Sequence, residues 1–210
     1  MNQNFGEGPI WKNVVAQAIP LTIAQLVQLL YNIVDRIYIG HLPGVGTAAL
    51  TGVGLTFPII LFVTAFTSLF GMGGAPLCSI ARGAGNRERA ERVMACSFTL
   101  LAGSSLIIMA VCYLFMEPVL YLFGASDATY GYASSYLKIY LLGTVSVMIG
   151  TGMNYFINSQ GFPGAAMVTT LLGAVLNLVL DPVFIFLFDM GVPGAALATI
   201  LSQTASAIWV

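Results

Sequence analysis

Two carboxylates lie inside long apolar stretches of the sequence, each at the end of a row of polar side chains. The first row is Gln25, Gln28, Asn32 and Asp35, and the second is Asn177 and Asp181. Spacings of three and four residues put each row on one face of a helix. Amides within a membrane commonly form hydrogen bonds between helices. A carboxylate there is costly, and it indicates a binding site for a proton or an ion.

Asp35, Asp181 and Thr199 fall at similar depths in their apolar stretches. At a rise of about 1.5 Å per residue, they lie roughly 7, 11 and 10 Å from the ends predicted to face the outside. Together with Asn177 they would form a layer of carboxylate, amide and hydroxyl oxygens. Hard cations such as Na⁺ prefer oxygen ligands, and buried carboxylates can also bind and release a proton. We therefore expect an H⁺ or Na⁺ site and no other cofactor.

Further polar side chains interrupt the later apolar stretches. They are expected to line a polar cavity together with the amides of the first row, and the full set is Gln25, Gln28, Asn32, Asn154, Asn158 and Gln203.

The elements that carry these residues are set by the composition. Only 7% of the 210 residues are charged, against about 25% in soluble domains, and the mean hydropathy is +0.91. Five uncharged stretches are each at least 21 residues long, and a helix crosses the hydrocarbon core in about 20. This pattern predicts an all-α, multi-pass membrane protein in the lipid bilayer. The net charge of −1 argues against nucleic-acid binding.

Six membrane spans are predicted, and they form a single lobe. Their approximate ranges are 13–39, 50–80, 93–115, 133–157, 165–188 and 193–210. Basic residues favour the cytoplasmic side, which places Lys12, Arg82, Arg87, Arg89 and Arg92 inside, with Arg36 and Lys138 toward the outside. The N-terminus is thus expected in the cytoplasm. Because the sixth span is still apolar at Val210, we expect a truncated chain.

Local signals predict several helix starts. Asn86 precedes a helix on which Glu88 and Arg92 are spaced for an ion pair. Asp127, which follows Ser126, is expected to cap another helix. Pro-Gly pairs at Pro43, Pro163 and Pro193 precede apolar segments, where proline suits a first helical turn. Aromatic residues near the outer ends are expected to form an interfacial belt, and these are Tyr38, Tyr113, Phe115, Tyr121, Phe123, Tyr130, Tyr132 and Tyr136.

Several motifs together resemble the multidrug and toxic compound extrusion (MATE) transporters. They are NLVLDPVFIF from Asn177, GVPGAALAT from Gly191, Ser202-Gln203, SQGFPGAAM from Ser159, ARGAGNRERA from Ala81, and a first span with Pro20, Gln25, Tyr31-Asn32, Val34-Asp35 and Tyr38-Ile39-Gly40. The resemblance covers nearly the whole chain, in the order and spacing of the family.

The resemblance implies the N-terminal lobe of a twelve-helix antiporter, with the C-terminal lobe as its missing partner. It implies export of organic cations or drugs across the cell membrane, in exchange for H⁺ or Na⁺, by alternating access. In this family's pattern the ion-coupling residues fall on Asp35, Asp181, Asn177 and Thr199, with the Ala195 carbonyl as a further ligand.

Other functions stay open at this point. A lipid-linked saccharide flippase of the same superfamily would need basic residues deep in a span to hold pyrophosphate, and this chain has none there. An intramembrane aspartyl protease would resemble a Tyr-Asp and Gly-x-Gly-Asp pair, but Val34 precedes Asp35 and Leu180 precedes Asp181. A non-transporting membrane subunit is a further alternative. We expect no enzymatic activity.

Overall fold

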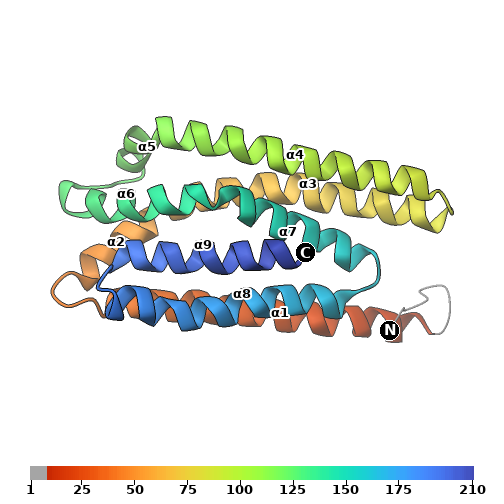
Figure 1. The fold of residues 1–210 in the computed structure, drawn as a ribbon, viewed down its shortest axis with the longest axis horizontal. Coiled ribbons are helices and arrows are strands. Elements are labelled where there is room, and N and C mark those ends of the chain that lie inside the picture. Colours follow the sequence, from red (N-terminus) through yellow and green to blue (C-terminus); the bar gives the residue numbers. More distant parts are fainter. Residues whose placement is uncertain (1–8) are drawn as a thin grey trace.

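The computed structural model describes residues 9–210, which form a bundle of helices with no strands (Figure 1). In chain order these are α1 (Ile10–Gly40), α2 (Gly46–Leu55), α3 (Phe57–Gly83), α4 (Arg87–Leu114), α5 (Met116–Leu122), α6 (Asp127–Leu142), α7 (Thr144–Ser159), α8 (Pro163–Pro182), a π-helical segment (Val183–Leu187) and α9 (Val192–Trp209). The prediction of an all-α fold is confirmed. Residues 1–8 lie outside the described range, and the N-terminus predicted to be cytoplasmic is among them.

The middle of the bundle is formed by α7 and α9 (Figure 1). On one side α7 packs against the α3–α4 pair, and on the other α9 packs against α8, which in turn holds α1. Small residues allow the close approach of α3 and α7: a Cβ on Gly71 would lie 3.0 Å from the Gly152 carbonyl oxygen. Because α7 also packs against α8 and α9, and α8 packs against α1, the amide-bearing segments of α7, α8 and α9 lie together near α1.

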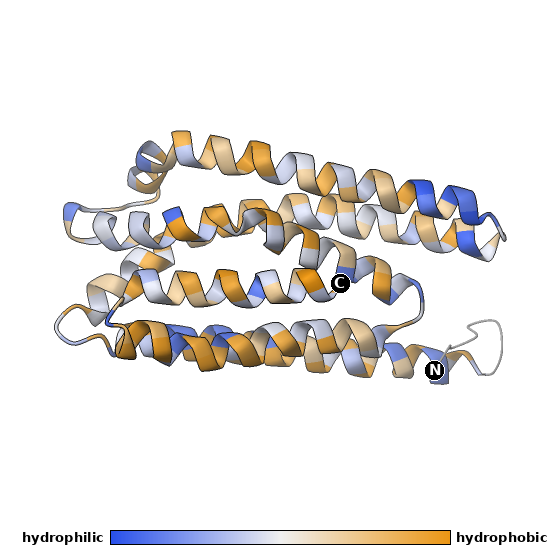
Figure 2. Cartoon of the chain, in the orientation of Figure 1, coloured by the Kyte–Doolittle hydropathy of each residue, from blue (hydrophilic) through white to orange (hydrophobic). Residues whose placement is uncertain are grey.

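The outer surface of the bundle is apolar along its length. Large hydrophobic side chains of α1, α3 and α4 are exposed, and hydrophilic colours gather near the two ends (Figure 2). By length and composition, four stretches can cross a membrane, and the bent pair α6–α7 would be a fifth. Among the described helices, the more polar α9 does not meet this criterion. The sixth span therefore stays a prediction.

Two predicted spans are broken. The span over 50–80 divides at Thr56, whose hydroxyl donates to the Val53 carbonyl oxygen at 2.7 Å. The span over 133–157 consists of α6 and α7, which meet at an angle of 59°. At this bend Ile200 of α9 fills the space beside Gly143, where a Cβ would lie 2.6 Å from it. The bend thus depends on a partner helix, which a local sequence pattern does not reveal.

Local capping explains where several helices begin. The Asn86 side chain accepts a hydrogen bond from the Arg89 amide at 2.9 Å, so α4 begins six residues before the predicted span. The prediction that Asp127 caps α6 was wrong by one residue: Ser126 is the cap and forms a capping box with Thr129, and Asp127 is the first residue of the helix. The predicted ion pair of Glu88 and Arg92 is present.

The three Pro-Gly pairs occupy two kinds of position, a helix start or a turn. Pro163 is the first residue of α8, and Pro193 lies in the first turn of α9, as predicted. The pair at Pro43 instead lies in the turn before α2, with Gly44 at a φ of 75°. Glycine suits this left-handed conformation because it has no Cβ.

The corner between α8 and α9 has an unusual backbone. Pro182 has no amide hydrogen to continue the α-helical pattern, and the chain continues as a π-helix, in which the Phe188 amide donates to the Val183 carbonyl. Gly194 then packs against this segment: a Cβ there would lie 2.7 Å from the Phe184 carbonyl oxygen. Such π-helical turns are frequent at functional sites, and this one lies directly after Asp181.

Candidate functional site

A connected group of polar atoms joins α8 to α9. The Asn177 amide nitrogen donates to Asp181 Oδ1 at 3.1 Å and approaches Thr199 Oγ1 at 3.4 Å. The Thr199 hydroxyl donates to the Ala195 carbonyl oxygen at 3.0 Å. Asp181 is completely buried and Asn177 is nearly so. Four of the five residues predicted for the ion site therefore lie together.

The fifth predicted residue, Asp35, reaches the same region from α1. It is one of three buried residues on that long helix, with 9% of its surface exposed, and its charge interacts with that of Asp181. The neighbouring Arg36 lies 6.0 Å from the Phe57 ring centre. Within residues 9–210 neither Asp35 nor Asp181 has an ion pair. The two carboxylates thus share a buried region without an ion pair, although the charge of Arg36 acts on Asp35.

Three buried oxygen atoms in this region have no hydrogen-bond partner among the described residues, and they are Asp35 Oδ1, Asn177 Oδ1 and Asp181 Oδ2. An unsatisfied buried polar atom is costly, so this arrangement is suited to an additional ligand that interacts with oxygen. A proton or a hard cation such as Na⁺ fits this donor set. No cluster of three or more His, Cys, Asp or Glu side chains occurs in the described part of the chain.

Two tyrosines at this site were not predicted to belong to it. Tyr136 of α6 interacts with Asp35 and with the Thr199 side chain. We expected Tyr136 in the interfacial belt, and this was wrong: only 5% of its surface is exposed, and it packs in a core cluster with Ala195. The apolar stretch alone does not show which face of α6 meets α9.

Tyr31 of α1 interacts with Asn32 and Gln203, and its hydroxyl is influenced by the charges of Asp35 and Asp181. It lies four residues before Asp35, and this spacing puts the two side chains on one helix face. The same spacing that selected the amides could therefore have selected Tyr31.

A cavity of about 240 Å³ lies between α1, α7, α8 and α9, and both apolar and polar side chains line it. Five of the six residues predicted to line a cavity surround it, and they are Gln25, Gln28, Asn154, Asn158 and Gln203. Asn32 does not line it, and its side chain donates to the Gln28 carbonyl oxygen of its own helix at 2.7 Å. Tyr31 also lines the cavity, and this residue connects the cavity to the carboxylate region.

The amides of α7 present acceptor atoms at this cavity. Asn154 donates to the Ala166 carbonyl oxygen at 3.2 Å, and Asn158 donates to the Asn154 carbonyl oxygen at 3.1 Å. The side-chain oxygens of both are buried and have no partner in the described structure. No Lys, Arg, Asp or Glu lies among the lining residues that the structure describes. The cavity therefore offers neutral hydrogen-bonding groups to a ligand.

A known family model covers most of the chain. The MatE model matches residues 20–183, which include Asp35 of α1 and Asp181 of α8 but not Thr199 of α9. The chain belongs to the MatE family. Relatives of the chain are named as transporters and export proteins.

Curated relatives of this MatE chain include multidrug export proteins MepA. The protein from Staphylococcus haemolyticus (strain JCSC1435) is 30% identical over 164 residues, which cover 78% of this chain and 36% of the relative. The MepA of Staphylococcus aureus (strain NCTC 8325 / PS 47) is 29% identical over 166 residues, with the same coverage of both chains. The chain thus spans about a third of the length of these relatives.

Solved structures of MATE proteins have the same fold. One described as MATE in the bent conformation has a TM-score of 0.88 and 30% identity, covering 96% of this chain and 44% of that chain. Another, an outward-facing multidrug resistance MATE family transporter, has a TM-score of 0.87, 30% identity and coverages of 94% and 43%. A transporter of the MOP superfamily from Pyrococcus furiosus matches equally well. The chain corresponds to one lobe of these transporters.

Proposed function

We propose that this chain is the N-terminal lobe of a multidrug exporter, which moves organic cations out of the cell in exchange for H⁺ or Na⁺. The single observation that carries the proposal is the pair of buried carboxylates with unpartnered oxygens beside a neutral, amide-lined cavity. The names of the relatives, multidrug export proteins and multidrug resistance transporters, support the same function.

In this mechanism the carboxylates bind the coupling ion. Asp35 and Asp181 attract a proton or Na⁺, and Asn177, Thr199 and the Ala195 carbonyl supply further oxygens. H⁺ and Na⁺ neutralise the same carboxylates and therefore compete. Tyr136 and Tyr31 hold hydroxyl groups near these carboxylates. In this proposal the site binds and releases the coupling ion and catalyses no chemical reaction of the transported substrate.

The cavity supplies the drug subsite in this proposal. Its amide and hydroxyl groups form hydrogen bonds of either polarity, which suits substrates of varied structure. A substrate cation in the neutral cavity is stabilised when the nearby carboxylates have lost their coupling ion. Binding of the ion and binding of the drug are thereby made to oppose each other, which is the requirement for exchange.

Alternating access requires two bundles that move about a shared site. We propose that a C-terminal lobe is the partner of this chain and that the two lie in the cytoplasmic membrane, with the N-terminus in the cytoplasm. The basic ends of α3 and α4 support this orientation. A saccharide flippase is less well supported, because the lining of the cavity has no basic side chain among the described residues to hold a pyrophosphate.

The test is ion-driven drug efflux from proteoliposomes that contain the full-length transporter. Asp35→Asn and Asp181→Asn keep the size of each side chain and remove its charge, so each is expected to abolish most efflux under both H⁺ and Na⁺ gradients. Asp189→Asn is the matched control, since Asp189 is exposed in the α8–α9 corner and lies outside the site. Efflux like that of the wild type from both site variants would refute the proposal.

A further inference from the structure

One end of the bundle carries most of its positive charge. The turn between α3 and α4 lies at the same end as the start of α1 (Figure 1). Five basic residues occupy these segments, namely Lys12, Arg82, Arg87, Arg89 and Arg92, against two described acidic residues, Glu88 and Glu91. The segments toward the other end carry Arg36 and Lys138 together with Glu117, Asp127 and Asp189. The charge of the molecule is therefore strongly asymmetric.

Three arginines of the α3–α4 turn have no acidic partner. Arg92 pairs with Glu88, whereas Arg82, Arg87 and Arg89 form no ion pair with any residue in the described range. All three side chains are exposed. The turn that joins them is short, because Gly85 adopts a φ of 75° and Asn86 caps α4 immediately afterwards. Their charges are thus held close together and available to an external anion.

The arginines lie where the apolar surface ends. On α3, Leu77 is 54% exposed and Ile80 is 68% exposed, so both face hydrocarbon in a membrane. Arg82 follows Ile80 by two residues, which is a rise of about 3 Å along the helix. Figure 2 shows this change from apolar to hydrophilic at the end of α3 and the start of α4. This is the level at which lipid phosphates lie.

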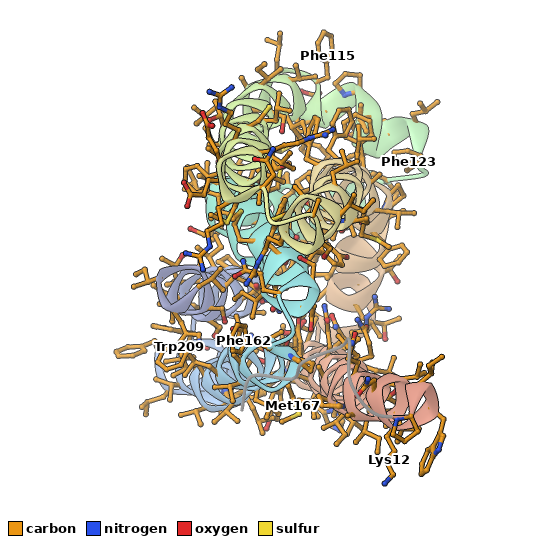
Figure 3. All side chains as sticks on the ribbon, turned by 90° about the vertical axis from the view of Figure 1, so that its right-hand side faces the viewer. Lys12, Phe115, Phe123, Phe162, Met167 and Trp209 are labelled. Atoms are coloured by element: carbon orange, nitrogen blue, oxygen red, sulfur yellow. The ribbon has the colours of Figure 1, made fainter. Side chains whose placement is uncertain are left out.

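A further basic side chain lies at the same end of the bundle, on α1. Lys12 of α1 is exposed and points outward from the bundle in the view from this end (Figure 3). Its amino group lies 5.6 Å from the centre of the exposed Trp11 ring. A tryptophan beside a lysine is typical of the membrane interface, and it marks the headgroup level on α1 independently of the α3–α4 turn.

We propose that the α3–α4 turn binds the headgroups of anionic phospholipids through Arg82, Arg87 and Arg89. Guanidinium groups form paired hydrogen bonds with phosphate oxygens, and the exposed apolar residues of α3 pack against the acyl chains of the same lipid. A lipid is the favoured ligand over a soluble anion because the charged and the apolar groups are adjacent. The cytoplasmic leaflet, where the orientation proposed above puts this turn, is the leaflet that carries anionic lipids.

The experiment measures lipid binding to the purified protein in detergent by native mass spectrometry. Phosphatidylglycerol and phosphatidylcholine with identical acyl chains are titrated separately, and the wild type is expected to bind phosphatidylglycerol more tightly. One basic residue near a lipid surface contributes about a five-fold change in affinity, so Arg87→Gln should weaken phosphatidylglycerol binding by about that factor. The triple variant Arg82→Gln, Arg87→Gln, Arg89→Gln should bind both lipids equally.

Two controls make the test specific. Lys138→Gln removes one basic residue outside the turn and should leave phosphatidylglycerol binding unchanged. Glycerol 3-phosphate carries the phosphate without acyl chains and should not compete at equal concentration. The proposal is overturned by equal binding of the two lipids to the wild type, by undiminished phosphatidylglycerol binding in Arg87→Gln, or by competition from glycerol 3-phosphate. The single variant keeps the test valid if the triple variant does not fold.

Discussion

Gly194 and Gly164 occupy the same position in two identical Pro-Gly-Ala-Ala motifs, but their surroundings differ. At Gly194, an added Cβ would lie 2.7 Å from the Phe184 carbonyl oxygen, 2.8 Å from its carbon and 3.0 Å from the Ile185 nitrogen. At Gly164, no atom lies within 4 Å of the same Cβ. Both glycines lie in the first turn of a helix, so alanine changes the helix propensity similarly at each. A difference in stability between the two alanine variants therefore reports the difference in packing.

The size of the effect follows from these distances. Ordinary contacts begin at 3.4 Å, so the Cβ of Gly194→Ala requires α9 and the π-helical segment to separate by about 0.7 Å. The opposing atoms belong to the backbone and cannot rotate away. Overpacking of this kind costs about 1–3 kcal/mol, while replacing a helical glycine by alanine contributes about 0.5–1 kcal/mol of stability. Gly194→Ala should be destabilised, and Gly164→Ala should be unchanged or slightly stabilised.

The assay is the apparent unfolding temperature of each variant in detergent, followed by intrinsic fluorescence. Gly194→Ala is expected to unfold at a lower temperature than the wild type, and Gly164→Ala at the same or a higher one. Ion-driven efflux should fall in Gly194→Ala as well, because Ala195 and Thr199 lie on the displaced turns of α9. Equal unfolding temperatures for the two variants would refute the reasoning, since the packing difference is all that distinguishes them.

Two further predictions concern the site and the topology. Tyr136→Phe removes a hydroxyl that interacts with Thr199 and Asp35, so it should reduce ion-driven efflux by about tenfold, on the order of 1.4 kcal/mol. Tyr140→Phe, whose ring stacks on Tyr136 at 6.1 Å, should retain efflux, and an equal loss in both variants would contradict a specific role for Tyr136. The α3–α4 turn should face the cytoplasm, so a cysteine at Arg87 should react with an impermeant reagent in inverted vesicles and stay unlabelled in intact cells; labelling of intact cells would reverse the orientation.

The helical fold and the positions of the two carboxylates could be predicted from the sequence because both depend on local properties. A segment with few charges favours the membrane whatever its neighbours are, and the spacing of Asn177 and Asp181 determines that they share a helix face. Helix starts at Asn86 and Pro163 were predictable for the same reason. The Asn86 cap depends on a backbone amide three residues away, and Pro163 depends on its own fixed backbone angle.

The tertiary structure decided which faces meet. Tyr136 has the sequence context of an interfacial residue, yet α9 packs over it and makes it part of the ion site. Asn32 shares the periodicity of Gln25 and Gln28, but its side chain bonds to its own helix and does not line the cavity. The bend at Gly143 and the packing at Gly194 depend on Ile200 and on the π-helical segment. The position of Tyr136, the bend and the Gly194 packing arise from contacts between different helical segments, and a local periodicity contains no information about them.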